Sequence, residues 1–279
     1  MNEKTNGTRP DLLIFDVDGV LIDTRDSYMH VTAEAIRWCW ENVYGGTADG
    51  EGYTLHYFNL CKTHPSFNDD SAIAWAFLQY MEKTGKRSMK EAFPSLAAWA
   101  EELKKYGRKT AADEIASTKE TRISLDEIRT VTDEIYLGKE AYREFKNIPA
   151  RGISDGGLWT MERPSLDRHW TSFGMPVAIY TGRSPDEMTL ARRQLDWQDF
   201  PQQMVIDSGS GILKPSPQGL QILCDRAQAR QPLFFGDTAS DRESWKAFGK
   251  GLFVAIGPIL SGRSPHFATL GEALSALSL

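Results

Sequence analysis

The stretch Leu12–Val20 reads LLIFDVDGV and places two carboxylates directly after a run of large apolar side chains. Four consecutive apolar residues between polar segments are typical of a strand that is covered on both faces, as in a parallel sheet. Side chains alternate along a strand, so we expect Asp16 and Asp18 to point to the same side, while Gly19 lets the chain turn just beyond them. Since parallel sheets present ligand sites at the carboxyl ends of their strands, the stretch predicts a strand that delivers two acids to a site.

A second apolar run occupies residues 177–180, and Thr181, Gly182 and Arg183 follow it directly. The next two residues are Ser and Pro, which are typical of an N-cap and of the first position of a helix. Free backbone amides and a hydroxyl at a helix start bind anions, so Thr181 is a candidate for holding a phosphate oxygen. Gly182 and Arg183 are candidate substrate contacts because they lie beside it.

Two further segments repeat the pattern of an apolar strand followed by polar residues. Residues 204–206 precede a loop that contains Lys214, and the prolines around this loop prevent the strand from continuing. Residues 232–235 lead into the hexapeptide GDTASD, which supplies Asp237 and Asp241. An ammonium group can screen two negative groups from each other, and hard carboxylate oxygens suit Mg²⁺.

Four such pieces in this order resemble the haloacid dehalogenase (HAD) superfamily, whose motifs are Asp-x-Asp, a Ser or Thr after the second strand, a Lys, and Gly-Asp-x-x-x-Asp. The resemblance implies an α/β fold with a Rossmann-like, three-layer core around a parallel sheet. We expect its strands near residues 12–16, 177–181, 204–207, 233–236 and 252–256. The implied site contains the nucleophile Asp16, the general acid and base Asp18, the phosphate-holding pair Thr181 and Lys214, and a Mg²⁺ ion held by Asp16, the backbone carbonyl of Asp18, Asp237 and Asp241.

The resemblance also implies that the residue two positions after the nucleophile selects the chemistry. Asp18 favours phosphate ester hydrolysis, because a departing alkoxide needs a proton. The resemblance therefore implies a phosphatase that hydrolyses a small phosphorylated metabolite through an aspartyl phosphate on Asp16. A phosphomutase would use the same aspartate pair, and a binding protein of the same fold without turnover is a third alternative. The substrate itself stays open between phosphoglycolate, sugar phosphates, nucleotides and a histidine-pathway phosphate.

The segment 24–154 differs from the rest because its apolar residues recur at helical spacing and no strand pattern is present. It resembles the helical cap that the first HAD subfamily inserts after the first motif, although it is longer than usual. We predict a catalytic core at 1–23 and 155–279 and a cap at 24–154 that supplies substrate selectivity. The glycines within 149–157 are candidate hinges, and Arg25, beside the outgoing connection, is a candidate substrate contact.

Composition excludes several classes of function. The chain has 279 residues, 41% of them hydrophobic, with a net charge of −6 and no basic run, which argues against a nucleic-acid partner. No stretch approaches the roughly 20 apolar residues of a membrane span, and residues 1–10 lack the apolar core of a signal peptide. Three scattered cysteines suit a reducing cytoplasm. The oligomeric state stays open.

Overall fold

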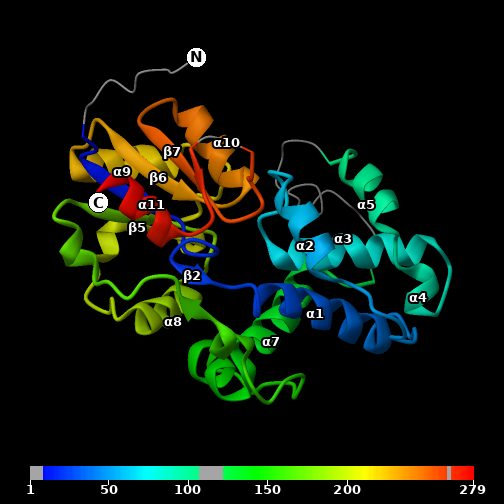
Figure 1. The fold of residues 1–279 in the computed structure, drawn as a ribbon. Coiled ribbons are helices and arrows are strands. Elements are labelled where there is room, and N and C mark those ends of the chain that lie inside the picture. The colour runs from blue at the N-terminus through cyan, green and yellow to red at the C-terminus, as the bar shows by residue number, and fades with distance from the viewer. Residues whose placement is uncertain (1–8, 107–121, 263–264) are drawn as a thin grey trace. The chain divides into compact units, whose positions relative to one another are not determined.

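The structure is a computed structural model that describes residues 9–106, 122–262 and 265–279, so most of the polar N-terminal stretch lies outside the described residues. The chain forms two compact units (Figure 1). The first contains Met1–Ile22 and Pro164–Leu279, and the second contains Asp23–Arg163. The chain crosses between them at β2 (Ile22–Asp23) and β3 (Arg163–Pro164), which pair as a two-stranded sheet. No helix among the described residues is long and apolar enough to cross a membrane.

The first unit is built on a six-stranded sheet in the order β5-β4-β1-β6-β7-β8, and every pair in it is parallel. The predicted α/β fold with a parallel sheet is therefore confirmed. The sixth strand, β8, was not predicted, because two residues without an apolar run give no strand signal. The strands are β1 (Leu12–Phe15), β4 (Val177–Tyr180), β5 (Val205–Ile206), β6 (Pro232–Gly236), β7 (Leu252–Ile256) and β8 (His266–Phe267).

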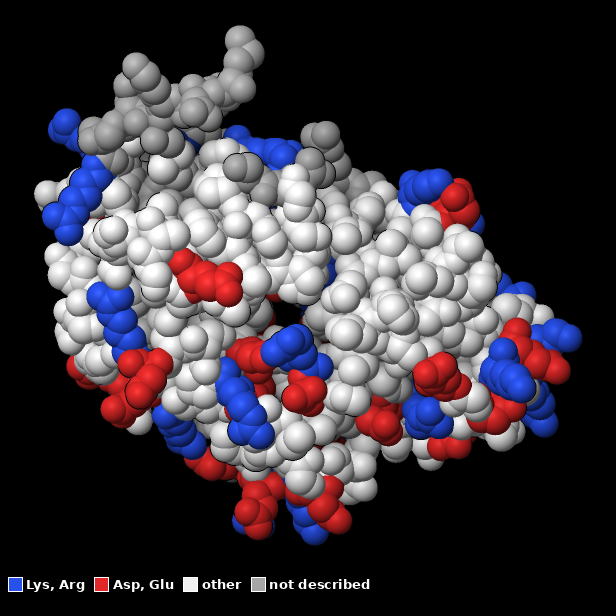
Figure 2. Space-filling view, in the orientation of Figure 1, with Lys and Arg blue, Asp and Glu red and all other residues white. Residues whose placement is uncertain are grey.

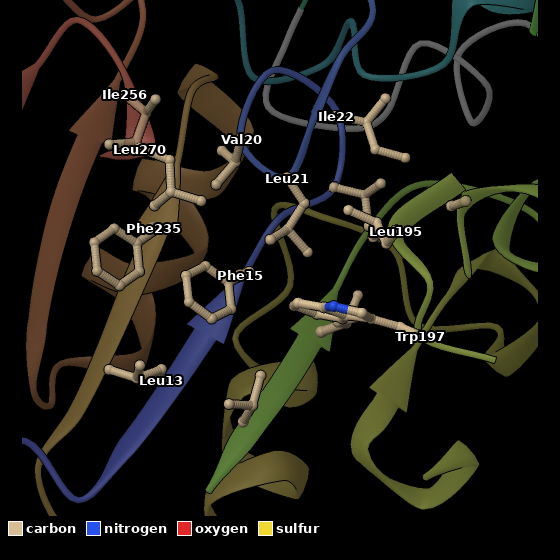
Figure 3. Packing of buried hydrophobic residues seen from close by; sticks show 14 of the residues in the cluster. Leu13, Phe15, Val20, Leu21, Ile22, Leu195, Trp197, Phe235, Ile256 and Leu270 are labelled. Atoms are coloured by element: carbon tan, nitrogen blue, oxygen red, sulfur yellow. The ribbon is translucent and has the colours of Figure 1, made fainter. Parts of the chain in front are cut away.

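Both faces of this sheet are covered, as the continuous apolar runs predict. Leu13 and Phe15 pack on one face with α8 (Pro185–Leu195) and α11 (Leu270–Leu277) (Figure 3). Leu12 and Ile14 pack on the other face with α9 (Gln218–Ala227) and α10 (Ala239–Phe248). All four side chains of β1 are fully buried, and each such burial stabilises the fold by roughly 1.5–3 kcal/mol. Short 3₁₀ helices lie at Trp170–Phe173, Gln202–Met204 and Ser208–Ser210.

The strand order sets the position of the site. From β1 the chain moves to β4 and β5 on one side, and then to β6, β7 and β8 on the other side. The connections that leave β1 and β6 therefore diverge, although the two strands are neighbours in the sheet. Ligand sites in open parallel sheets form at such a point, outside the carboxyl ends of the strands.

The described part of the second unit is helical between β2 and β3. The apolar residues that recur at helical spacing form its core, in which Trp99 is fully buried and stacks on Phe77 with ring centroids 3.8 Å apart. A capping box of Ser124 and Glu127 begins the helix at Leu125. The helices are α1 (Tyr28–Asn42), α2 (Leu55–Lys62), α3 (Asp70–Lys83), α4 (Met89–Ala92), α5 (Leu96–Leu103), α7 (Leu125–Lys146) and a 3₁₀ helix at Leu158–Met161.

The segment 149–157, which we predict as a hinge, is attached to α7 of its own unit. The fully buried carboxylate of Glu134 accepts hydrogen bonds from the backbone N–H groups of Arg151, Gly152 and Ile153 at 2.7–2.8 Å. Two helical stretches of α7 meet at a kink at Gly138, whose φ of 72° and ψ of 167° suit glycine alone. Any motion of this segment relative to α7 has to break these contacts.

We expect Gly138→Ala to destabilise the protein by about 3 kcal/mol or more. A Cβ at this position would lie 2.3 Å from the backbone nitrogen of Gly157, in addition to the unfavourable φ. The matched control is Gly156→Ala, because this exposed neighbour has open space around its Cβ and should change stability by less than about 0.5 kcal/mol. Chemical denaturation of both variants measures the difference, and equal stabilities would contradict the role of the kink.

Candidate active site

Three buried carboxylates converge at the carboxyl ends of β1 and β6. Asp16 follows β1, Asp237 follows β6, and Asp241 lies in the first turn of α10. One carboxylate oxygen of each lies within 4.8 Å of the other two. In the described part of the chain, this is the only group of three or more such side chains close enough to share a metal ion. The strand order thus brings together acids that are more than 200 positions apart in the sequence.

The first turn of α10 explains the spacing of the last motif. One oxygen of Asp241, Oδ2, accepts hydrogen bonds from the backbone N–H groups of Asp237 at 3.3 Å and Thr238 at 3.0 Å, and from the Thr238 hydroxyl at 2.7 Å. Asp241 therefore caps the helix with one oxygen and faces the site with the other. Thr238 was not predicted, although Thr-x-x-Asp at a helix start is a recognisable capping signal.

Lys214 lies between two of these acids. Its buried ammonium forms ion pairs with Oδ1 of Asp16 at 2.7 Å and with Oδ1 of Asp241 at 2.5 Å. Burial alone would lower the pKa of Lys214, but the two carboxylates outweigh burial and raise this pKa, so the side chain stays charged. The loop that carries it is fixed by the hydroxyl of Tyr180, which donates a 2.8 Å hydrogen bond to the carbonyl of Ser216.

The charges of the site favour a divalent cation. Four carboxylates, those of Asp16, Asp18, Asp237 and Asp241, face two cationic side chains, so ionisation of all of them leaves two negative charges in excess. Burial, with the neighbouring acids, raises the pKa of Asp16 to about 7 against the attraction of Lys214, and it also raises the pKa of Asp237.

The polar atoms around Asp237 also favour a bound cation. Among the described residues, Oδ1 of Asp237 is buried and has no hydrogen-bond partner. A buried carboxylate oxygen without a partner is costly, and a metal ion would satisfy it. Gly19 makes room for this carboxylate, because a Cβ on Gly19 would lie 2.1 Å from its Oδ2. This donor set of hard oxygens fits Mg²⁺.

Arg183 pairs with the second acid of the first motif. Its Nε donates a hydrogen bond to Oδ1 of Asp18 at 2.8 Å, and its Nη2 forms an ion pair with the same oxygen at 2.7 Å. The Arg183 side chain is fully buried, whereas 31% of the Asp18 side chain is exposed. This pairing gives the guanidinium a partner that the sequence analysis did not predict. The local sequence around Arg183 gives no indication that its side chain is buried against Asp18, because the two residues are far apart in the sequence.

The remaining candidates lie as follows. Thr181 is buried directly after β4, and its Oγ1 accepts a 3.2 Å hydrogen bond from the backbone N–H of Arg183. Gly182 is half-buried between them. Arg25 belongs to the second unit, where its side chain is 72% exposed and forms an ion pair with Asp23. The six residues of the four motifs all belong to the first unit, and their catalytic roles stay predictions.

The raised pKa of Asp16 predicts a pH-dependent stability in chelator. The folded protein holds the proton of this carboxyl up to a pKa of about 7, whereas the unfolded chain releases it near pH 4, so its contribution to stability falls as pH rises through this window. The free energy of unfolding, measured relative to Asp16→Asn, should decrease by at most about 1.4 kcal/mol per pH unit between pH 4 and 7. Denaturant titrations at several pH values measure it, and a constant difference would contradict the raised pKa.

Comparisons with solved structures find the same fold in other proteins. The chain matches a phosphatase, Tt82 from Thermococcus thioreducens, with a TM-score of 0.59 and 23% identity over 96% of this chain and 99% of that one. It also matches a haloacid dehalogenase-like protein from Agrobacterium tumefaciens (TM-score 0.50, 14% identity, 97% and 98% of the two chains). A hydrolase from Pseudomonas syringae has the same TM-score, 0.50, at 12% identity over 95% and 97% of the two chains. Identities this low show a shared fold. A search of curated proteins finds no match.

The sequence itself carries the family assignment. The sequence model of the haloacid dehalogenase-like hydrolases matches residues 10–249, which include all four motifs. The predicted resemblance is thereby confirmed, and the chain belongs to the haloacid dehalogenase-like hydrolase family.

Proposed function

We propose that the protein is a Mg²⁺-dependent phosphatase that hydrolyses a small phosphorylated metabolite through an aspartyl phosphate on Asp16. The observation that carries this proposal is the buried cluster of Asp16, Asp237 and Asp241 with Lys214 between two of its members. A nucleophilic carboxylate must approach an anionic phosphoryl group, and this approach requires positive charge at the same place. Lys214 and a metal ion on the three acids would supply that charge.

Each residue then has a defined task. A carboxylate oxygen of Asp16 attacks phosphorus, and the bond between phosphorus and the ester oxygen breaks. Asp18 gives a proton to the departing alkoxide and later takes one from the water that hydrolyses the acyl phosphate, which regenerates Asp16. Thr181 and Lys214 hold oxygens of the phosphoryl group. Asp16, Asp237, Asp241 and the carbonyl of Asp18 would hold Mg²⁺, which would supply positive charge against the negative charge of the transferring group.

Phosphate release from a generic aryl phosphate tests this proposal. Purified protein with Mg²⁺ should release one phosphate for each phenol, and a panel of phosphorylated metabolites should then identify the preferred ester. A phosphomutase would convert a sugar phosphate into its isomer and release phosphate only feebly. The absence of both reactions would indicate a binding protein and would contradict the proposal.

The partners and the location follow from the surface and the cysteines. Acidic and basic side chains lie interspersed on the face in Figure 2, without a broad basic patch that would suit nucleic acid. Cys39, Cys61 and Cys224 are buried and free, which fits a reducing compartment, and we place the protein in the cytoplasm. We propose that the cap, residues 24–154, which lies within the second unit, supplies selectivity between leaving groups, because the motifs recognise only the phosphoryl group.

A further inference from the structure

The contact between Arg183 and Asp18 joins a buried cation to a half-buried acid. Two N–H groups of the guanidinium converge on a single carboxylate oxygen, Oδ1, at 2.8 and 2.7 Å. The Arg183 side chain has no exposed surface, whereas the Asp18 side chain is 31% exposed. The contact therefore joins a fixed buried cation to a carboxylate that still reaches solvent.

The backbone of Arg183 is held on both sides. Its N–H donates to Oγ1 of Thr181 at 3.2 Å, and its carbonyl accepts a 2.9 Å hydrogen bond from the N–H of Ser208. Its Nη1 also lies 3.5 Å from the carbonyl of Glu187 in α8. A guanidinium with a fixed backbone and a planar fork of donors imposes a direction on the carboxylate that it binds.

We propose that Arg183 is a positioning residue that orients Asp18 for proton transfer to the leaving group. This inference rests on the proposed function, in which Asp18 is the general acid. Because Arg183 engages Oδ1, the oxygen that meets the leaving group is Oδ2. A buried side chain whose donors already bind Asp18 is poorly placed to bind substrate directly. Arg183 should therefore affect catalysis by way of Asp18.

The dependence on the leaving group tests this role. An alkyl phosphate needs a proton on its departing oxygen, whereas dinitrophenyl phosphate leaves as a stable anion without one. We expect Arg183→Met to lower kcat/KM for an alkyl phosphate by about 100-fold and kcat/KM for dinitrophenyl phosphate by less than about 3-fold. The ratio kcat/KM is the right quantity because it reports the steps up to departure of the leaving group.

Three further variants serve as comparisons in this experiment. Asp18→Asn should show the same selective loss, and adding Arg183→Met to it should cause no further loss on the alkyl ester, since the two residues act as a unit. Arg183→Lys keeps the charge but loses the planar fork of donors, so its kcat/KM for the alkyl ester should lie between those of the wild type and Arg183→Met. It replaces Arg183→Met in the test if that variant does not fold. Arg193→Met removes an exposed arginine of α8 and should leave both esters unaffected.

The outcomes separate the inference from the proposed function. If the Arg183 variants lost equal factors in kcat/KM on both esters, while Asp18→Asn lost kcat/KM mainly on the alkyl ester, the positioning role alone would be overturned. A rise in KM for both esters would identify Arg183 as a substrate contact and would also overturn it. A loss in Asp18→Asn that does not depend on the leaving group would overturn Asp18 as general acid, and the inference would fail with it.

Discussion

Asp16→Asn should abolish phosphate ester hydrolysis, with a loss of at least about 10⁴-fold in kcat/KM. The amide has nearly the same shape as the carboxylate but lacks the nucleophilic oxygen, so no phosphoenzyme can form. The change also removes one of the two ion-pair partners of Lys214, whereas the other partner, Asp241, remains. The measurement is phosphate release from an aryl phosphate, together with acid-quenched trapping of labelled phosphoenzyme.

Asp18→Asn is the matched control for this prediction, because it removes a carboxylate two positions away without removing the nucleophile. Attack by Asp16 is still expected, so some phosphoenzyme should accumulate while its hydrolysis is slow. Both variants must show cooperative unfolding, so that loss of structure is excluded. Near-normal turnover in Asp16→Asn would refute the assignment of the nucleophile.

Removal of the metal should cause the second large effect. The three carboxylates leave uncompensated negative charge that opposes attack on an anionic ester, so chelation should lower hydrolysis by at least about 10³-fold. Mg²⁺ should restore activity, whereas Ca²⁺ should support it poorly because it is larger and less strict in geometry. The activity of the dialysed protein, titrated with each ion, measures this.

Asp237→Asn provides the control for the metal site. Its buried Oδ1 has no hydrogen-bond partner among the described residues, which makes Asp237 the clearest candidate ligand outside the nucleophile. This variant should need a higher Mg²⁺ concentration for half-maximal activity, and Mg²⁺ should raise its Tm less than it raises that of the wild type. Equal activity in chelator and in Mg²⁺ would contradict the proposed mechanism.

The core of the fold could be predicted because its main strands correspond to short apolar runs in the sequence. Residues 12–15 and 177–180 are buried on both faces, and such runs need no distant context to be recognised. The strand β8 could not be predicted, since His266–Phe267 becomes a strand only through pairing with β7. Within α7, the non-helical Gly138 separates two helical stretches, in agreement with the separate apolar patterns on either side of it.

The convergence of the motif residues was predictable for the same reason. Acids that follow parallel strands gather at one edge of the sheet, whatever their separation in the sequence. The contacts within the cluster depend on tertiary packing and could not be predicted. Neither the bridge from Lys214 to Asp241 nor the burial of Arg183 against Asp18 has a counterpart in local spacing.

The central claim is that Asp16 carries the phosphoryl group, and chemical trapping tests it most directly. Borohydride reduces an acyl phosphate to an alcohol, so quenching the protein during turnover with Mg²⁺ and an aryl phosphate, followed by reduction and peptide mass spectrometry, marks the modified residue. Asp18→Asn is the preferred protein for this measurement because its phosphoenzyme should persist. We predict reduction at Asp16, only with substrate present. Reduction at another acid, or no reduction in protein that turns over, would contradict the account.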